Sequence, residues 1–325
     1  MTDLSYVLPL RWEEDEGIDE LAGYLQEVSE IAEVVVVDGS TPAMFDRLDE
    51  RLGSPIRHLP PHEDLAFVMG KVNGVTTGVR EATNDYVVVA DDDVRYSPSA
   101  LRRVRSLLDD HELVRPQNYF DPVPWHALWD TARTLLNRSV SVDYPGTLGL
   151  RRDFFLAMGG YDGNVMFENL ELIRTVQAHR GRVASPLDLY VRRIPPTTDR
   201  FVSQRVRQAY DDFAIPGRMA LWLALPPATA LSLARNRGGR VAAGAAVAMA
   251  VAEVGRRRAG GTSYFPATAP LFAPAWLLER GVCSWLALGS FALHGGVRYG
   301  GGIIRRAASS KRRLRKLAAS RTSAR

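Results

Sequence analysis

Three consecutive aspartates, Asp91, Asp92 and Asp93, follow the apolar run from Tyr86 to Ala90. The run predicts a buried parallel strand, so the carboxylates would lie at its carboxyl end, where open α/β sheets bind ligands. Carboxylate oxygens suit Mg²⁺ or Mn²⁺, which proteins commonly hold with one or two carboxylates and the phosphates of a substrate. The triplet therefore indicates a metal-bound diphosphate. An acidic turn that caps the following helix is the alternative at this point.

Strand and helix patterns alternate around the triplet. Strand-like runs occupy residues 4–8, 34–37, 56–59 and 85–90, and helical spacing covers 17–30, 42–52 and 70–83. Farther along, we expect a helix at 97–109, a second helix that ends at residue 137 and a third at 168–180. We also expect strands at 113–114 and 187–193. This βαβα order predicts an α/β fold, a doubly wound and mostly parallel sheet that is flanked by helices.

Charge divides the chain of 325 residues into two parts. Residues 1–213 hold 23 basic and 35 acidic side chains, whereas residues 214–325 hold 18 basic and 2 acidic ones. The acidic part argues against nucleic-acid binding, and the basic, apolar part fits an anionic membrane surface. A single cysteine, Cys283, excludes an intrachain disulfide. The acidic N-terminus lacks the pattern of a signal peptide, so we expect the first part in the cytosol.

Four apolar segments follow residue 217, at 218–233, 241–254, 265–278 and 281–297. None holds 18 uncharged apolar residues in a row, so none is a secure transmembrane helix by length. Helical hairpins in the bilayer, helices that lie in its interface and a soluble alanine-rich subdomain all stay open.

The last 21 residues carry nine Lys or Arg and no acidic residue. Such a tail is either a solvated arm or a contact with anionic lipid. We therefore expect a catalytic domain at 1–213, an apolar helical membrane-associated region at 214–304 and a basic tail at 305–325.

Several short motifs occur in an order that resembles the family 2 glycosyltransferases of GT-A fold. They are Leu8-Pro9, Asp38-Gly39-Ser40 after four valines, Gly70-Lys71-Val72-Asn73-Gly74, the aspartate triplet, Gly159-Gly160-Tyr161-Asp162 and Glu168-Asn169-Leu170-Glu171-Leu172. Each motif is weak alone, but their order and spacing over about residues 4–213 make a strong signal. The resemblance implies a Rossmann-like GT-A domain that uses a nucleotide-sugar donor, with a UDP-sugar favoured.

The resemblance also implies which residues bind the nucleotide. Asp38 matches the family's nucleotide-binding aspartate, Lys71 matches the basic residue beside the donor, and Pro9 belongs to the motif at the first strand. Lys71 is the only lysine before Lys311 in a chain that otherwise uses arginine. This bias hints at a need for a compact point charge, although a solvated helix lysine is the alternative.

The family's DXD metal motif maps onto Asp91 and Asp93. Asp93 would be the direct ligand of Mg²⁺ or Mn²⁺, with Asp91 nearer the ribose or the lysine and Asp92 beside them on the donor side or in the turn. Three adjacent carboxylates repel one another, so a bound cation would stabilise them.

Inverting transfer needs a base that takes the proton of the attacking hydroxyl. The family supplies it from a Glu-Asp pair, and this chain reads Glu168-Asn169. Asparagine cannot accept that proton, so Glu168 is the preferred base and Glu171 the second choice, while Asn169 could orient the acceptor.

A last motif, Gln204-Arg205-Val206-Arg207-Gln208, is similar to the Gln-x-x-Arg-Trp segment of members that act at membranes. Gln204 and Arg207 match, and Gln208 replaces the tryptophan. The resemblance implies that this segment closes over the diphosphate and precedes membrane helices. A plain amphipathic helix is the alternative.

We expect a metal-dependent inverting glycosyltransferase at the cell membrane, with its catalytic domain on the cytoplasmic face. Its acceptor would be a lipid-linked saccharide or an envelope glycan. A sugar nucleotidyltransferase would usually carry a glycine-rich loop after the first strand, and residues 8–12 hold no glycine. A non-catalytic sugar-nucleotide-binding or scaffold protein of the same fold is the alternative, which only the exchange at Asn169 supports.

Overall fold

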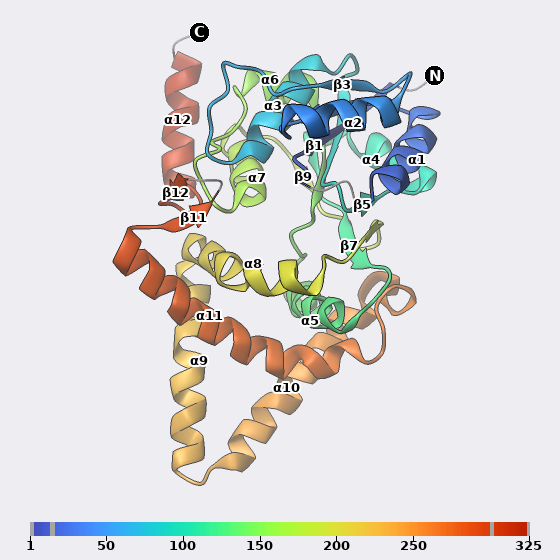
Figure 1. Cartoon of the computed structure of the whole chain (residues 1–325). Coiled ribbons are helices and arrows are strands. Elements are labelled where there is room, and N and C mark those ends of the chain that lie inside the picture. The colour runs from blue at the N-terminus through green and yellow to red at the C-terminus, as the bar shows by residue number, and fades with distance from the viewer. Residues whose placement is uncertain (1–2, 14–16, 300–301, 324–325) are drawn as a thin grey trace.

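The strands predicted around the aspartate triplet form one sheet in the computed structural model, which describes residues 3–13, 17–299 and 302–323. They are β1 (Leu4–Leu10), β2 (Glu33–Asp38), β3 (Arg57–Leu59), β4 (Tyr86–Ala90), β6 (Leu113–Val114), β8 (Thr147–Arg151) and β9 (Val183–Ala184). Their order is β3-β2-β1-β4-β8-β6-β9 (Figure 1). The first four strands run parallel, whereas β8 is antiparallel to both of its neighbours. The predicted α/β fold with a mostly parallel sheet is confirmed.

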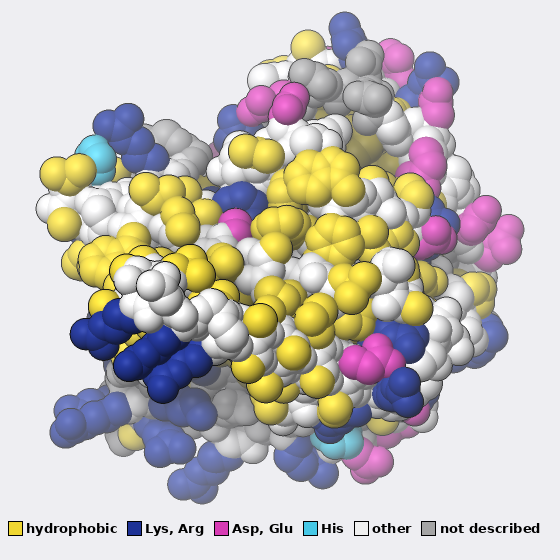
Figure 2. Space-filling view, turned by 90° about the horizontal axis from the view of Figure 1, so that it is seen from below, with side chains coloured by type: hydrophobic (Ala, Val, Ile, Leu, Met, Phe, Trp, Pro, Cys, Tyr) yellow, Lys and Arg dark blue, Asp and Glu magenta, His cyan; other side chains and the backbone are white. Residues whose placement is uncertain are grey.

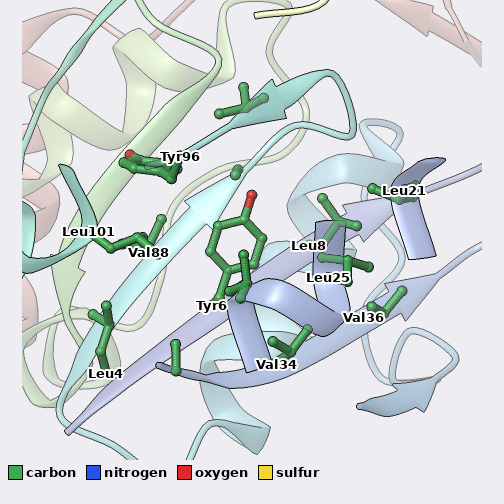
Figure 3. Close-up of a cluster of buried hydrophobic side chains, with 14 of the residues drawn as sticks. Leu4, Tyr6, Leu8, Leu21, Leu25, Val34, Val36, Val88, Tyr96 and Leu101 are labelled. Atoms are coloured by element: carbon green, nitrogen blue, oxygen red, sulfur yellow. The ribbon is translucent and has the colours of Figure 1, made fainter. Parts of the chain in front are cut away.

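Helices cover both faces of this sheet and bury its central strands on both sides. One face holds α1 (Ile18–Ser29), α2 (Pro42–Leu52) and α4 (Pro98–Leu107), and the other holds α3 (Gly70–Glu81), α6 (Arg152–Ala157) and α7 (Glu168–Ala178). Side chains alternate along β1, so Tyr6 and Leu8 pack under α1 while Val7 packs under α3. Figure 3 shows the first of these two cores, around Tyr6.

The candidate site lies where the strand order reverses. β1 pairs with β2 on one side and with β4 on the other, and open α/β sheets bind ligands at the carboxyl ends of such strands. A smaller sheet of β5 (Val94–Arg95), β10 (Tyr190–Arg193) and β7 (Gln117–Phe120) lies beside this point. Its register pairs Arg193 with Val94, which brings the arginine next to the aspartate triplet.

The C-terminal part is helical and docks on the α/β domain. It packs on α5 (Trp125–Val140), which lies between β7 and β8 in the chain. Its elements are α8 (Thr198–Tyr210), η1 (Asp211–Ala214), α9 (Pro216–Ala234), α10 (Gly238–Arg257), α11 (Ala273–His294), the hairpin of β11 (Val297–Tyr299) and β12 (Gly302–Ile304), and α12 (Lys311–Ser323). α9 and α10 form a V, and α11 crosses it (Figure 1). A Cβ on Gly255 of α10 would lie 1.9 Å from the Leu135 carbonyl oxygen of α5, so only glycine permits this close crossing.

The third and fourth apolar segments, at 265–278 and 281–297, are not separate helices. Glu279 and Arg280 lie inside the single helix α11. The Glu279 carboxylate pairs with Arg205 at 2.9 Å and accepts from the Trp129 indole at 3.1 Å. Because its charge is neutralised by partners on other helices, the helix continues through a position that looked like a boundary.

Two further expectations concern the apolar helices and the tail. Within the described residues, one segment, Gly238–Ser263, is long and apolar enough to cross a membrane, with a mean hydropathy of 1.2. The tail is not a free arm as far as residue 320, because α12 packs on α7 and buries Leu314 and Ala318. Residues 324 and 325 of the predicted tail lie outside the described part.

Candidate active site

Lys71, in the first turn of α3, lies between two carboxylates from different elements. Its Nζ atom is 2.6 Å from Oδ1 of Asp91, after β4, and 2.6 Å from Oε1 of Glu168, the first residue of α7. Burial disfavours the charged lysine, but Asp91 and Glu168 outweigh it and raise the pKa of Lys71 above its ordinary value. Lys71 is therefore a fixed positive charge that joins the predicted donor, metal and base positions.

A second cation, Arg193, pairs with the other oxygen of Asp91. Arg193 Nη2 is 3.5 Å from Asp91 Oδ2, and its Nε is 2.8 Å from Asp93 Oδ2. Burial outweighs this arginine and raises the pKa of Asp93 to about 6, with a further contribution from the neighbouring aspartates. Sequence reasoning missed Arg193; its position at the end of a predicted strand was the only signal, and the strand's partner was unknown.

Gly146 makes room for this arrangement. Its carbonyl oxygen accepts from the Asp91 amide at 2.9 Å. A Cβ at this position would lie 2.6 Å from Asp91 Oδ2 and 3.2 Å from the Arg193 guanidinium carbon. The glycine therefore lets the Asp91–Arg193 pair press against the strand that follows.

The carboxylates fit a divalent cation. Asp93 Oδ1 is buried and has no hydrogen-bond partner within the part of the chain described, so it is an uncommitted oxygen that suits a cation. Residues 3–13, 17–299 and 302–323 contain no group of three or more His, Cys, Asp or Glu that could hold a metal. Mg²⁺ usually needs only one or two carboxylates when substrate phosphates complete its shell, and Asp91 and Asp93 supply that number.

The other predicted donor residues lie close by, in structural roles as well. Asp92 Oδ2 accepts from the Trp12 indole at 2.6 Å, which fixes the turn after β4. Asp38 is almost fully buried at the end of β2, where it accepts from the Ser40 amide at 2.7 Å and lies 3.3 Å from His58 Nε2. Pro9 of β1 is buried against α3.

The residues predicted around the base separate into two environments. Glu168 is nearly buried; its second carboxylate oxygen accepts from the Asn169 amide. The Asn169 side chain donates to the Pro145 carbonyl at 3.1 Å, beside Lys71. Glu171 is fully buried, and its Oε2 accepts from the Ser309 amide at 2.6 Å. Glu171 thus holds the C-terminal segment, whereas Glu168 is grouped with Lys71 and Asp91.

The Gln-x-x-Arg segment lies on α8, which is anchored by the arginine between its two matching residues. Arg205 pairs with Asp130 of α5 at 2.8 Å and with Glu279 of α11 at 2.9 Å. Gln204 is half-buried, and the Arg207 guanidinium carbon lies 5.3 Å from the Tyr299 ring centroid. The Arg207 side chain of α8 therefore faces the β11–β12 hairpin at Tyr299, and Gln204 lies three positions earlier on the same helix.

Asp211, which begins η1 directly after α8, was not predicted. Its Oδ1 is buried without a hydrogen-bond partner among the residues described. Burial is the main cause that raises the pKa of Asp211 to about 7; the charges of Asp212 and Glu168 act in the same direction, and those of Arg280 and Arg207 oppose it. The Asp211-Asp212 pair after the Gln-x-x-Arg segment could have drawn attention to this position.

Comparison with known proteins gives three results. Residues 20–168 match the family model described as glycosyl transferase family 2. The solved structure of mannosyltransferase PcManGT from Pyrobaculum calidifontis, in complex with GDP-Man and Mn²⁺, has a TM-score of 0.51 and 20% identity, and the match covers 87% of each chain. Glucosyl-3-phosphoglycerate synthase from Mycobacterium tuberculosis, in complex with Mn²⁺, UDP and phosphoglyceric acid, has a TM-score of 0.44 and 18% identity over 63% of this chain and 76% of that chain. No curated protein matches the chain.

Proposed function

Because residues 20–168 match the model of glycosyl transferase family 2, we propose that the protein moves a sugar from a nucleotide-sugar donor to an acceptor hydroxyl with inversion at the anomeric carbon. One observation carries the proposal. Lys71, Asp91 and Glu168 come from three separate elements and meet within ion-pair distance. A cation for the diphosphate, a carboxylate for a metal and a carboxylate base thus occupy one site.

The donor would bind at the carboxyl ends of β1, β2 and β4. Asp38 would accept hydrogen bonds from the nucleoside, and Lys71 would turn to a donor phosphate. Asp91 and Asp93 would hold Mg²⁺ or Mn²⁺, which when bound offsets the negative charge that develops on the leaving nucleoside diphosphate. UDP-sugars are the first donors to test, followed by GDP-sugars.

Glu168 is our proposed base. In the structure its carboxylate is paired with Lys71 at 2.6 Å. A donor phosphate competes for that lysine, and the pairing with Glu168 weakens as Lys71 turns to the phosphate. Glu168 is then available to take the proton of the acceptor hydroxyl as its oxygen attacks the anomeric carbon. Asn169 would keep the turn before α7 in place through its bond to Pro145.

Calorimetric titration with UDP-, GDP- and dTDP-sugars, with and without Mn²⁺, tests this proposal. Asp93→Asn should abolish the metal-dependent part of donor binding, because it removes the charged ligand atoms. Glu168→Gln should bind donor and lose transfer by ~10²-fold or more. Exposed Asp110→Asn and Glu50→Gln are matched controls. Donor binding that does not depend on Mn²⁺ would contradict the proposed metal site. Full transfer activity in Glu168→Gln would contradict the role of Glu168 as base.

We propose that the acceptor is lipid-linked or an envelope glycan and that the protein reaches it from the cytoplasmic face of a membrane. The support is an exposed apolar surface on the helices of the V and on α11. Its large members are at least half-exposed: Leu221, Leu231, Leu233, Val247, Val254, Val282, Trp285, Leu286 and Leu293. Figure 2 shows apolar side chains spread over this underside of the molecule, with arginines and lysines at its margin.

The turn between α9 and α10 carries three exposed arginines, Arg235, Arg237 and Arg240. Each basic side chain near an anionic surface contributes about 1 kcal/mol, so together they would contribute about 3 kcal/mol, or roughly 100-fold in affinity. Sedimentation with vesicles of phosphatidylglycerol or phosphatidylcholine tests this. The variant with all three arginines replaced by glutamine should bind the anionic vesicles more weakly by that factor. An unchanged affinity would contradict the contact of this turn with an anionic membrane surface.

A further inference from the structure

The segment after the β11–β12 hairpin returns to the α/β domain and contacts the two residues that precede the proposed base. The Met166 amide donates to the Arg306 carbonyl at 2.9 Å, and the Phe167 amide donates to the Ala307 carbonyl at 2.8 Å. Phe167 is the residue immediately before α7, so the second bond lies one position from Glu168. Figure 1 shows the hairpin and α12 beside α7, although more than 110 residues separate them in sequence.

Side chains fix the same segment at three more points. The Ser309 amide donates to Glu171 at 2.6 Å, and Arg174 of α7 donates to the Ser309 carbonyl at 2.9 Å. Arg306 pairs with Asp162 at 2.8 Å, in the loop that leads to α7. The C-terminal segment therefore binds the first two turns of α7 and the loop that precedes this helix.

These bonds are unlike those of a loosely attached tail. Ser309 is 3% exposed, and Glu171 is fully buried, so its carboxylate would be left without this donor if the segment detached. A buried carboxylate that loses its hydrogen-bond donor is costly. The Tyr210 hydroxyl at the end of α8 also donates to the Arg305 carbonyl at 3.0 Å, which links the segment to the proposed diphosphate-closing helix.

We propose that residues 305–310 form a positioning strap that holds the start of α7, and with it the Glu168 carboxylate, in the geometry required for proton transfer from the acceptor. The inference rests on the proposed function of Glu168 as base. Its physical basis is that the strap supplies partners to backbone amides and to a buried carboxylate of α7, while Glu168 itself remains directed at Lys71. A displaced strap would leave the donor site, on β1, β2 and β4, in place.

The strap also connects catalysis to the apolar helices. The hairpin that precedes it follows directly from α11, and Val297 and Ile304 of the hairpin are buried in the same core as Leu172 and Ile173 of α7. Cys283 and Ala287 of α11 belong to that core as well, so α11, the hairpin and α7 share one packed core. The strap lies where the apolar region and the proposed base meet.

Two variants of the full chain test the strap. Ser309→Pro removes the amide that Glu171 accepts from, and Arg306→Ala removes the pair with Asp162; neither residue touches the donor or metal positions. Each should lower kcat by ~10- to 100-fold, as a misplaced catalytic group does, with the donor KM and the donor affinity in Mn²⁺ changed by less than about threefold. Arg306→Lys should restore most of the rate. Arg315→Ala, an exposed arginine of the same tail, is the control.

Amide hydrogen exchange supplies a readout that needs no activity. The Met166 and Phe167 amides should be protected in the wild type and exchange at least tenfold faster in both variants. If they exchange faster while kcat is unchanged, or if they are unprotected in the wild type, the strap does not position the base. If Ser309→Pro does not fold, Arg306→Ala and its lysine rescue decide. A wild type that binds donor but transfers nothing, with these amides protected, would instead contradict the proposed function.

Discussion

Replacing Asp211 by asparagine should change how the stability of the protein depends on pH. Burial raises the pKa of this carboxyl from 3.8 to about 7, and its Oδ1 has no hydrogen-bond partner within the described residues. Between these two pH values the folded protein keeps a proton that the unfolded chain has lost. Stability then falls as pH rises through this window, because the unfolded state binds fewer protons.

The magnitude follows from the shift. About three pKa units at 1.36 kcal/mol each give about 4 kcal/mol of stability present below pH 4 and lost by pH 7. An asparagine side chain at this position would imitate the protonated carboxyl at every pH. We therefore expect Asp211→Asn to match the wild type near pH 4 and to exceed it at pH 8 by up to about 4 kcal/mol, a figure that already includes the opposing attraction of Arg280.

Urea unfolding followed by tryptophan fluorescence, at half-unit steps from pH 4 to pH 8, measures this difference. The control is Asp212→Asn, since Asp212 is fully buried and pairs with Arg218. Because this substitution removes the carboxylate that pairs with Arg218, it should destabilise the protein by about 3 kcal/mol near neutral pH. If the wild-type and Asp211→Asn profiles run parallel across the whole range, the Asp211 carboxyl is not held protonated and the reasoning from its burial is wrong.

Three other substitutions test the cluster around the triplet. Lys71→Met leaves two carboxylates without their shared cation and should lower the free energy of unfolding by about 3 kcal/mol in urea, whereas an unchanged midpoint would show that the pairs contribute nothing. Gly146→Ala places a Cβ 2.6 Å from Asp91 Oδ2 and should cost about 1–3 kcal/mol and weaken Mn²⁺ binding in a calorimeter, while Gly239→Ala, in open space, should do neither. Arg193→Gln should tighten Mn²⁺ binding without donor by ~10-fold, about 1.4 kcal/mol, in a paramagnetic resonance titration, because a competing cation is removed; weaker binding would show that Arg193 supports the metal instead.

The sheet, and the positions of most residues of the candidate site, could be predicted because their signals are local. A run such as Val34 to Val37 needs no distant partner to indicate a strand buried on both faces, and the helices between such runs fix the topology. Once the strands are parallel, their carboxyl ends must share one edge. Asp38 and the aspartate triplet therefore had to lie close together, and the glycine and lysine of α3 with them.

The remainder could not be predicted because it depends on pairs that are distant in sequence. Glu279 looked like the end of an apolar segment, because Arg205, which pairs with its carboxylate, is 74 positions away in the chain. Glu171 sits three positions from Glu168 in a helix start that suited a second base, yet the donor that claims its carboxylate is Ser309. Local patterns predict which segments are helical, but a buried charge is explained only by the group that faces it, and that group is known only when the chain has folded back on itself.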